Sequence, residues 1–177
     1  MKVIGPLNGS MKRMAAAGDE LWFTLEVEFV AEQVWCSDGT TAGTRMVKSL
    51  PYLWRTPPTG YTAVDSLGLV FFAANDGVTG YELWKSDGTT AGTELVLDIR
   101  ASGDSKPTVL HALGDVLLFR ALDGTGSSLW RSDGTAAGTE FVHERGFSSS
   151  VHAVGSRWIY YRASDLAIGN ELWRTDG

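Results

Sequence analysis

The chain has 177 residues, of which 44% are apolar and 20% charged, a composition typical of a globular domain with a real core. Its net charge of −6 is unfavourable for binding phosphates, so we expect no nucleic-acid partner. No apolar run is long enough for a membrane helix, so we expect no membrane insertion. The 21 Gly and seven Trp favour short strands joined by tight turns.

The N-terminal stretch MKVIGPLNGSMKR lacks the long apolar core of a secretory signal. The single cysteine, Cys36, excludes an internal disulfide and a cysteine-based zinc site. No histidine lies near Cys36 in the sequence, so we interpret it as a bystander thiol and not as a nucleophile.

A Trp-x-Ser/Thr-Asp-Gly phrase recurs four times along the chain. Its tryptophans and aspartates are Trp35 and Asp38, Trp84 and Asp87, Trp130 and Asp133, and Trp173 and Asp176. The phrase returns every 43 to 49 residues, and a strand-rich repeat of that length is typical of β-propeller blades. The fold we expect is therefore all-β, a propeller of four blades in a single domain over residues 1–177.

Each repeat predicts four strands, and the repeats cover roughly residues 8–50, 60–100, 106–145, and 149–177 with 1–7. A first strand ends near a glycine, and an aromatic run follows. The Trp strand comes next, and a turn of the SDGTxAGT type leads to an outer strand. Asp-Gly between strands is a strong hairpin signal. Consecutive apolar residues such as Phe71 and Phe72 indicate that the second strands are buried on both faces.

The last repeat stops at Gly177, before its outer strand, and Met1–Leu7 resembles the missing strand. We expect this N-terminal strand to complete the fourth blade and to close the ring within one chain, which would remove exposed sheet edges. The alternative is that two chains contribute four blades each to one eight-bladed propeller. The protein is thus expected to be a monomer or a homodimer.

The segment Glu82–Thr89, ELWKSDGT, resembles the ELWxxDGT repeat of bacterial proteins, and the likeness spans nearly the whole chain. Gln33 and Ser128 stand at the Glu position in the first and third copies. The resemblance implies an exported or cell-surface repeat module and implies no known reaction. Because two of four copies lack the glutamate, we do not expect it to be a functional ligand.

The repeated aspartates Asp38, Asp87, Asp133 and Asp176 have two interpretations. Calcium is one, although each loop offers only one carboxylate beside hydroxyls, and calcium takes six to eight oxygens. We favour the other, a structural turn in which Asp accepts backbone N–H bonds. Likewise the repeated tryptophans are expected to be core residues that pack blade against blade, with sugar stacking as the alternative.

Two further groups are candidate sites. The Pro-rich insert PYLWRTPPTGY between the first and second repeats places Tyr52, Trp54, Arg55 and Tyr61 in a possible exposed ligand-binding patch. His111 and His152 share a register in first strands, and we place Asp65 at the matching position of the second repeat. First strands line a propeller channel, so these three residues could hold a metal ion or water.

These patterns favour a non-enzymatic binding or scaffold module that presents its surface to a protein or a glycan. The alternative is lectin-like carbohydrate binding through exposed aromatic residues. The weakest hypothesis is a metal-dependent enzyme at the channel mouth around Asp65, His111 and His152. The sequence contains no Gly-x-Ser-x-Gly, His-Glu-x-x-His or phosphate-loop motif. No cofactor is expected, apart from the calcium or channel ion considered above.

Overall fold

The computed structural model describes residues 9–51, 60–143, 151–154, 157–165 and 169–176. These residues form 15 strands and one three-residue 3-10 helix, η1, Asp65–Leu67, which confirms the all-β prediction. In this part of the chain we find no helix long and apolar enough to cross a membrane.

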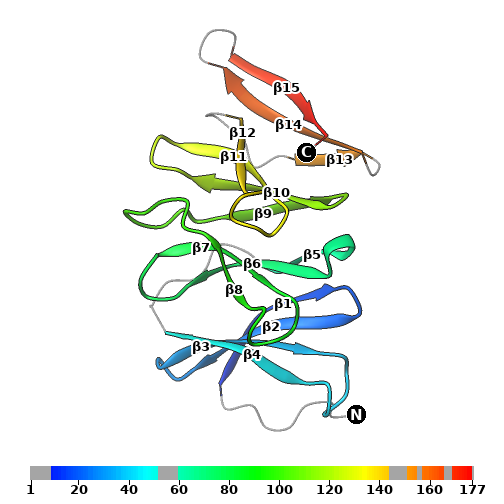
Figure 1. Ribbon diagram of the computed structural model, residues 1–177, viewed down its shortest axis with the longest axis vertical. Coiled ribbons are helices and arrows are strands. Elements are labelled where there is room, and N and C mark those ends of the chain that lie inside the picture. Colours follow the sequence, from blue (N-terminus) through cyan, green and yellow to red (C-terminus); the bar gives the residue numbers. More distant parts are fainter. Residues whose placement is uncertain (1–8, 52–59, 144–150, 155–156, 166–168, 177) are drawn as a thin grey trace.

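The strands form four antiparallel sheets in chain order (Figure 1). The first sheet contains β1 Ser10–Ala17, β2 Glu20–Val27, β3 Ala31–Ser37 and β4 Arg45–Pro51. The second contains β5 Thr62–Val64, β6 Leu69–Asn75, β7 Tyr81–Ser86 and β8 Glu94–Leu97. The third contains β9 Thr108–Leu113, β10 Val116–Leu122, β11 Ser127–Ser132 and β12 Glu140–His143. The fourth contains β13 Val151–Val154, β14 Trp158–Asp165 and β15 Gly169–Thr175.

Within each sheet, strands that are consecutive in sequence are hydrogen-bonded neighbours. The repeated tryptophan marks the same register in all four, because it always lies opposite an aromatic residue of the second strand. The pairs are Phe23 with Trp35, Phe72 with Trp84, Phe119 with Trp130, and Tyr161 with Trp173. Positions in different sheets can therefore be compared residue by residue.

The sheets stack face to face, and apolar side chains fill the layers between them (Figure 1). We call the face that a sheet turns to the preceding sheet its upstream face, and the other its downstream face. In the first sheet the upstream face is the one that points away from the second sheet. In the second sheet Phe72 belongs to the cluster shared with the first sheet, and Phe71 to the cluster shared with the third. Both rings are buried, which confirms the prediction that the second strands are covered on both faces.

The first and fourth sheets lie at opposite ends of the stack (Figure 1), so the described residues form an open stack of sheets and not a closed ring. The fourth sheet has three described strands, and β15 has a neighbour on one side only. The segment Met1–Leu7, which we expected to close the ring, lies outside the described residues.

Candidate functional site

The repeated SDGT turn is held by its own polar groups. In the second sheet Asp87 Oδ1 accepts hydrogen bonds from the backbone N–H and the hydroxyl of Thr89, at 2.9 and 2.7 Å. Ser86 Oγ accepts a bond from the Gly88 N–H at 3.1 Å and lies 2.6 Å from Thr93 Oγ1. The same bonds recur around Asp38 and around Asp133.

These contacts give the turn carboxylates a structural use. In each turn, the threonine that follows the aspartate by two residues donates hydrogen bonds to its carboxylate. These bonds lower the pKa values of Asp38, Asp87 and Asp133 below the ordinary value of an aspartate. Asp176, the fourth member of the set, is exposed. Among the described residues, no three His, Cys, Asp or Glu side chains gather closely enough to hold a metal ion.

The repeated tryptophans lie on the upstream faces of their sheets. Trp84 is 5% exposed and belongs to the apolar layer between the first and second sheets. Lys48 of β4 lies over its ring, with Nζ 5.3 Å from the ring centroid. Trp35, Trp130 and Trp173 are half-buried. Of the four, Trp84 offers almost no ring surface to a sugar.

The glutamate of the ELW phrase has a role that the sequence did not suggest. Glu82 is fully buried, and its carboxylate accepts bonds from the Ile99 N–H, the Ser105 N–H and the Ser105 hydroxyl, at 3.1, 2.8 and 2.6 Å. Burial raises the pKa of Glu82, and the bonds from Ser105 oppose that rise. Glu82 thereby fixes the loop that connects the second sheet to the third.

The motif itself does not reveal that Glu82 is buried, because Glu171 occupies the same motif position in the fourth sheet and is exposed. At the same position in the third sheet, Ser128 donates a hydrogen bond to Asp123 Oδ2 at 2.7 Å. The repeated position is therefore used for loop anchoring in different ways. Only the packing of the following loop shows which residue is buried.

The predicted aromatic patch of the insert is not assembled as we expected. Tyr61 is only 8% exposed, and its hydroxyl lies 2.7 Å from Thr24 Oγ1 in the layer between the first two sheets. Burial raises the pKa of Tyr61 to about 12. The prediction of an exposed Tyr61 is therefore wrong, because its ring packs against Trp22 and Phe72. Tyr52, Trp54 and Arg55 lie outside the described residues.

The strand register also shows which residues share a level in the predicted channel site of Asp65, His111 and His152. His111 pairs with Leu118 and His152 with Tyr160, which are equivalent positions of the second strands. The residue at that level in the second sheet is Thr62, which pairs with Phe71. Asp65 comes three residues later, at the start of η1. The placement of Asp65 beside the two histidines was wrong, because β5 ends before it and a 3-10 turn follows.

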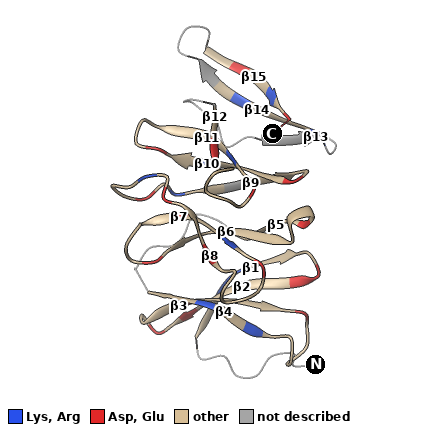
Figure 2. Ribbon diagram, viewed as in Figure 1, with Lys and Arg blue, Asp and Glu red and all other residues tan. Residues whose placement is uncertain are grey.

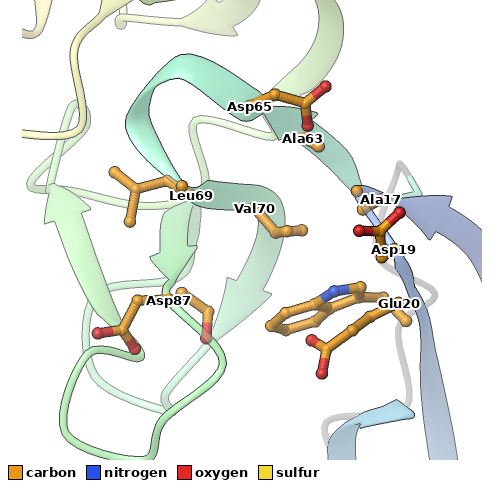
Figure 3. A pocket seen from close by; sticks show the side chains of 12 residues that line it. Ala17, Asp19, Glu20, Ala63, Asp65, Leu69, Val70 and Asp87 are labelled. Atoms are coloured by element: carbon orange, nitrogen blue, oxygen red, sulfur yellow. The ribbon is translucent and has the colours of Figure 1, made fainter. Parts of the chain in front are cut away.

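Asp65 instead lines a pocket of about 410 Å³ between the first two sheets (Figure 3). The carboxylates of Asp19 and Glu20 come to this pocket from the first sheet, and those of Asp65 and Asp87 from the second. Glu20 is paired with Arg45, whose Nη1 lies 2.9 Å from Glu20 Oε1. The pocket is therefore acidic on both sides.

Cys36 lies in the same layer and is fully buried. Burial raises the pKa of its thiol to about 11, and the nearby Glu20 carboxylate acts in the same direction. A thiol held neutral in this way is a poor nucleophile at neutral pH.

No family model and no curated protein matches the chain. Solved structures do match. They include a puromycin hydrolase at 15% identity and TM-score 0.59, TolB from Acinetobacter baumannii at 13% and 0.55, and a putative TolB from Agrobacterium tumefaciens at 13% and 0.55. The matches cover 93%, 95% and 90% of this chain, but only 26%, 41% and 58% of those structures.

At these identities the likeness shows the fold alone. The neighbours are propeller-type proteins, so this chain has a propeller-like stack of antiparallel sheets. It spans between about a quarter and three-fifths of the matched structures' length.

Proposed function

We propose that this chain is a non-enzymatic binding or scaffold module that acts through the surfaces of its stacked sheets. The observation that carries the proposal is the upstream face of the first sheet. There Met11, Met14, Leu21 and Met46 are 43%, 62%, 37% and 43% exposed, and register places them all on one side. A β-bulge at Arg13 brings Met11 and Met14 to the same face. Clustered exposed apolar side chains of this kind mark interaction surfaces.

The use of the polar groups supports the same function. The repeated Asp, Ser and Thr side chains of the turns form hydrogen bonds with one another, and the Glu82 carboxylate accepts hydrogen bonds from the loop that follows β8. The described Lys and Arg residues are spread along the stack and form no single band (Figure 2). Such a distribution is unfavourable for nucleic acid, which requires clustered basic residues.

Lectin-like binding is the second candidate, and the pocket between the first two sheets favours it. That pocket has carboxylates on both sides and Trp22 in its wall, although Trp22 is 2% exposed. An enzyme that uses a metal ion around Asp65, His111 and His152 is the weakest candidate, because Asp65 does not share the level of the histidines.

Tryptophan fluorescence separates the scaffold from the lectin. The purified chain is titrated with a panel of mono- and oligosaccharides, and a scaffold is expected to show no saturable change. A saturable change that Asp65→Ala abolishes would place a sugar in the pocket and would contradict our proposal. Stoichiometric metal that EDTA removes, measured on the same preparation, would favour the enzyme instead.

We also propose that the chain is a member of the ELWxxDGT-repeat group, and that Met1–Leu7 supplies the fourth strand next to β15. The first three sheets support this second point, because each has an outer strand paired with its Trp strand. The strand could come from the same chain, which closes a four-bladed ring, or from a second chain.

A further inference from the structure

Leu172 of β15 is 75% exposed, although its position is buried in every other sheet. The equivalent residues, counted from the repeated tryptophan, are Val34, Leu83 and Leu129, and each is 3% exposed or less. Leu83 is covered by the next sheet, since it belongs to one apolar cluster with Leu117 and Phe119. On the downstream face of the fourth sheet, Leu172 thus occupies a position that another sheet covers elsewhere in the chain.

Leu21 of β2 shows the converse at the other end of the stack. It is 37% exposed, whereas its equivalents Val70, Leu117 and Ile159 are 7%, 0% and 2% exposed. Those three residues lie in the layers between their own sheet and the preceding one. On the upstream face of the first sheet, Leu21 therefore lacks the cover that the preceding sheet gives to its three equivalents.

The SDGT turns give a third, independent sign. Within the chain, the Gly of this turn approaches the preceding sheet. A Cβ on Gly88 would lie 2.7 Å from Arg45 Nη2, and one on Gly134 would lie 2.7 Å from Leu69 Cδ1. Around Gly39, the equivalent residue of the first sheet, there is nothing within 4 Å. The turn of the first sheet thus lacks the contact that the other two turns make.

The two unpaired faces lie at opposite ends of the stack (Figure 1), so they do not meet within one copy in this arrangement. We propose that they meet between two copies. The upstream face of the first sheet of each copy packs on the downstream face of the fourth sheet of the other. This inference rests on the proposed function, because it names the partner of the apolar end face as a second copy of this chain.

The three internal interfaces predict the contacts. Leu172 of one copy would enter a layer with Leu21 of the other, as Leu83 does with Leu117. Arg174 would lie beneath the Gly39 turn, as Lys85 lies beneath Gly134 with its Cδ 3.6 Å from the Cβ position. Two identical contacts would use both end faces of both copies, which closes an eight-sheet ring.

Sedimentation velocity and light scattering on the 177-residue chain test the proposal. The expected result is a particle of about twice the 19.1 kDa chain mass. Leu21→Glu and Leu172→Lys each place a charge in the new layer, so each variant alone is expected to dissociate at least about tenfold more readily. Leu172 is mostly exposed in the isolated chain, so Leu172→Lys leaves the fold intact.

Mixing the two variants makes the test specific. A mixed pair keeps one unaltered interface and places the introduced carboxylate opposite the introduced ammonium in the other, so the dimer is expected to return. Val78→Lys is the matched control. Val78 is 87% exposed in the turn between β6 and β7, away from both end faces, and its variant should dimerise like the parent.

Several outcomes overturn the inference. The inference is wrong if the parent chain stays monomeric at all concentrations. It is also wrong if neither substitution weakens the dimer, or if the chain forms a filament that grows with concentration. These results leave the sugar and metal titrations unaffected, so failure of the dimer is distinguishable from failure of the scaffold function. A closed ring within one chain would appear as a monomer.

Discussion

At the residue scale, the repeated turn uses its two glycines for different reasons. Gly88 has a φ of +85°, a conformation that favours glycine, and an Asp-Gly turn predicts this from sequence. Gly92, at the end of the same turn, is required by space. A Cβ there would collide with the Asp87 carboxylate, and the same holds for Gly43 with Asp38 and Gly138 with Asp133. This second requirement is visible only once the carboxylate is placed.

Gly92→Ala therefore tests the packing of the turn. We expect a loss of about 1–3 kcal/mol in the free energy of unfolding, because the added methyl group displaces the Asp87 carboxylate from Thr89. Urea denaturation followed by tryptophan fluorescence measures it. Gly60→Ala is the control, since nothing lies within 4 Å of a Cβ there, and its effect should stay within about 0.5 kcal/mol. Equal losses in the two variants would disprove the role of Gly92.

At the scale of the element, the Trp strand does more than pack. In β7, Trp84 faces the preceding sheet, while Glu82 fixes the loop that leads to the next one. The strand was predictable from its pattern and its flanking turns. The burial of Glu82 was not, because it depends on the loop around Ile99 and Ser105 folding over the end of the sheet.

Glu82→Ala should loosen this connection. Removal of the carboxylate takes an acceptor from the Ile99 N–H and the Ser105 hydroxyl, so we expect a loss of about 2 kcal/mol or more in unfolding free energy. Hydrogen exchange should also become faster at Ile99. The matched variant is Glu171→Ala, which removes the exposed glutamate of the same motif and should change stability by less than about 0.5 kcal/mol. A tolerated Glu82→Ala would mean that the loop is held by other contacts.

At the scale of the whole molecule, the sheet at the C-terminal end of the stack has fewer described strands than the other three. The fourth sheet has three described strands, and β15 pairs with β14 alone among them. Free edges promote aggregation unless they are covered. The sequence suggested that Met1–Leu7 is the strand that pairs with β15. The strand register suggested that the two end faces contact those of a second copy.

Deletion of Met1–Leu7 tests the proposed closing strand. We expect the shortened chain to aggregate or to unfold at a lower urea concentration, because the edge of β15 would lose its partner. Light scattering and urea denaturation measure the two effects. Replacement of the segment by a Gly-Ser stretch of equal length is the control, and it should behave like the deletion. If the shortened chain is as stable and as soluble as the parent, the strand proposal is wrong.

The sequence by itself determined the local structure. Four units of antiparallel strands, their hairpin turns and the double-sided burial of Phe71 and Phe72 follow from turn chemistry and apolar patterns that act over a few residues. Tertiary packing decided the rest. The burial of Tyr61 and Glu82, the level of Asp65 beyond the end of β5 and the exposure of Leu21 and Leu172 depend on which sheet lies against which. The physical reason is that burial is set by neighbours distant in sequence, which a local pattern does not specify.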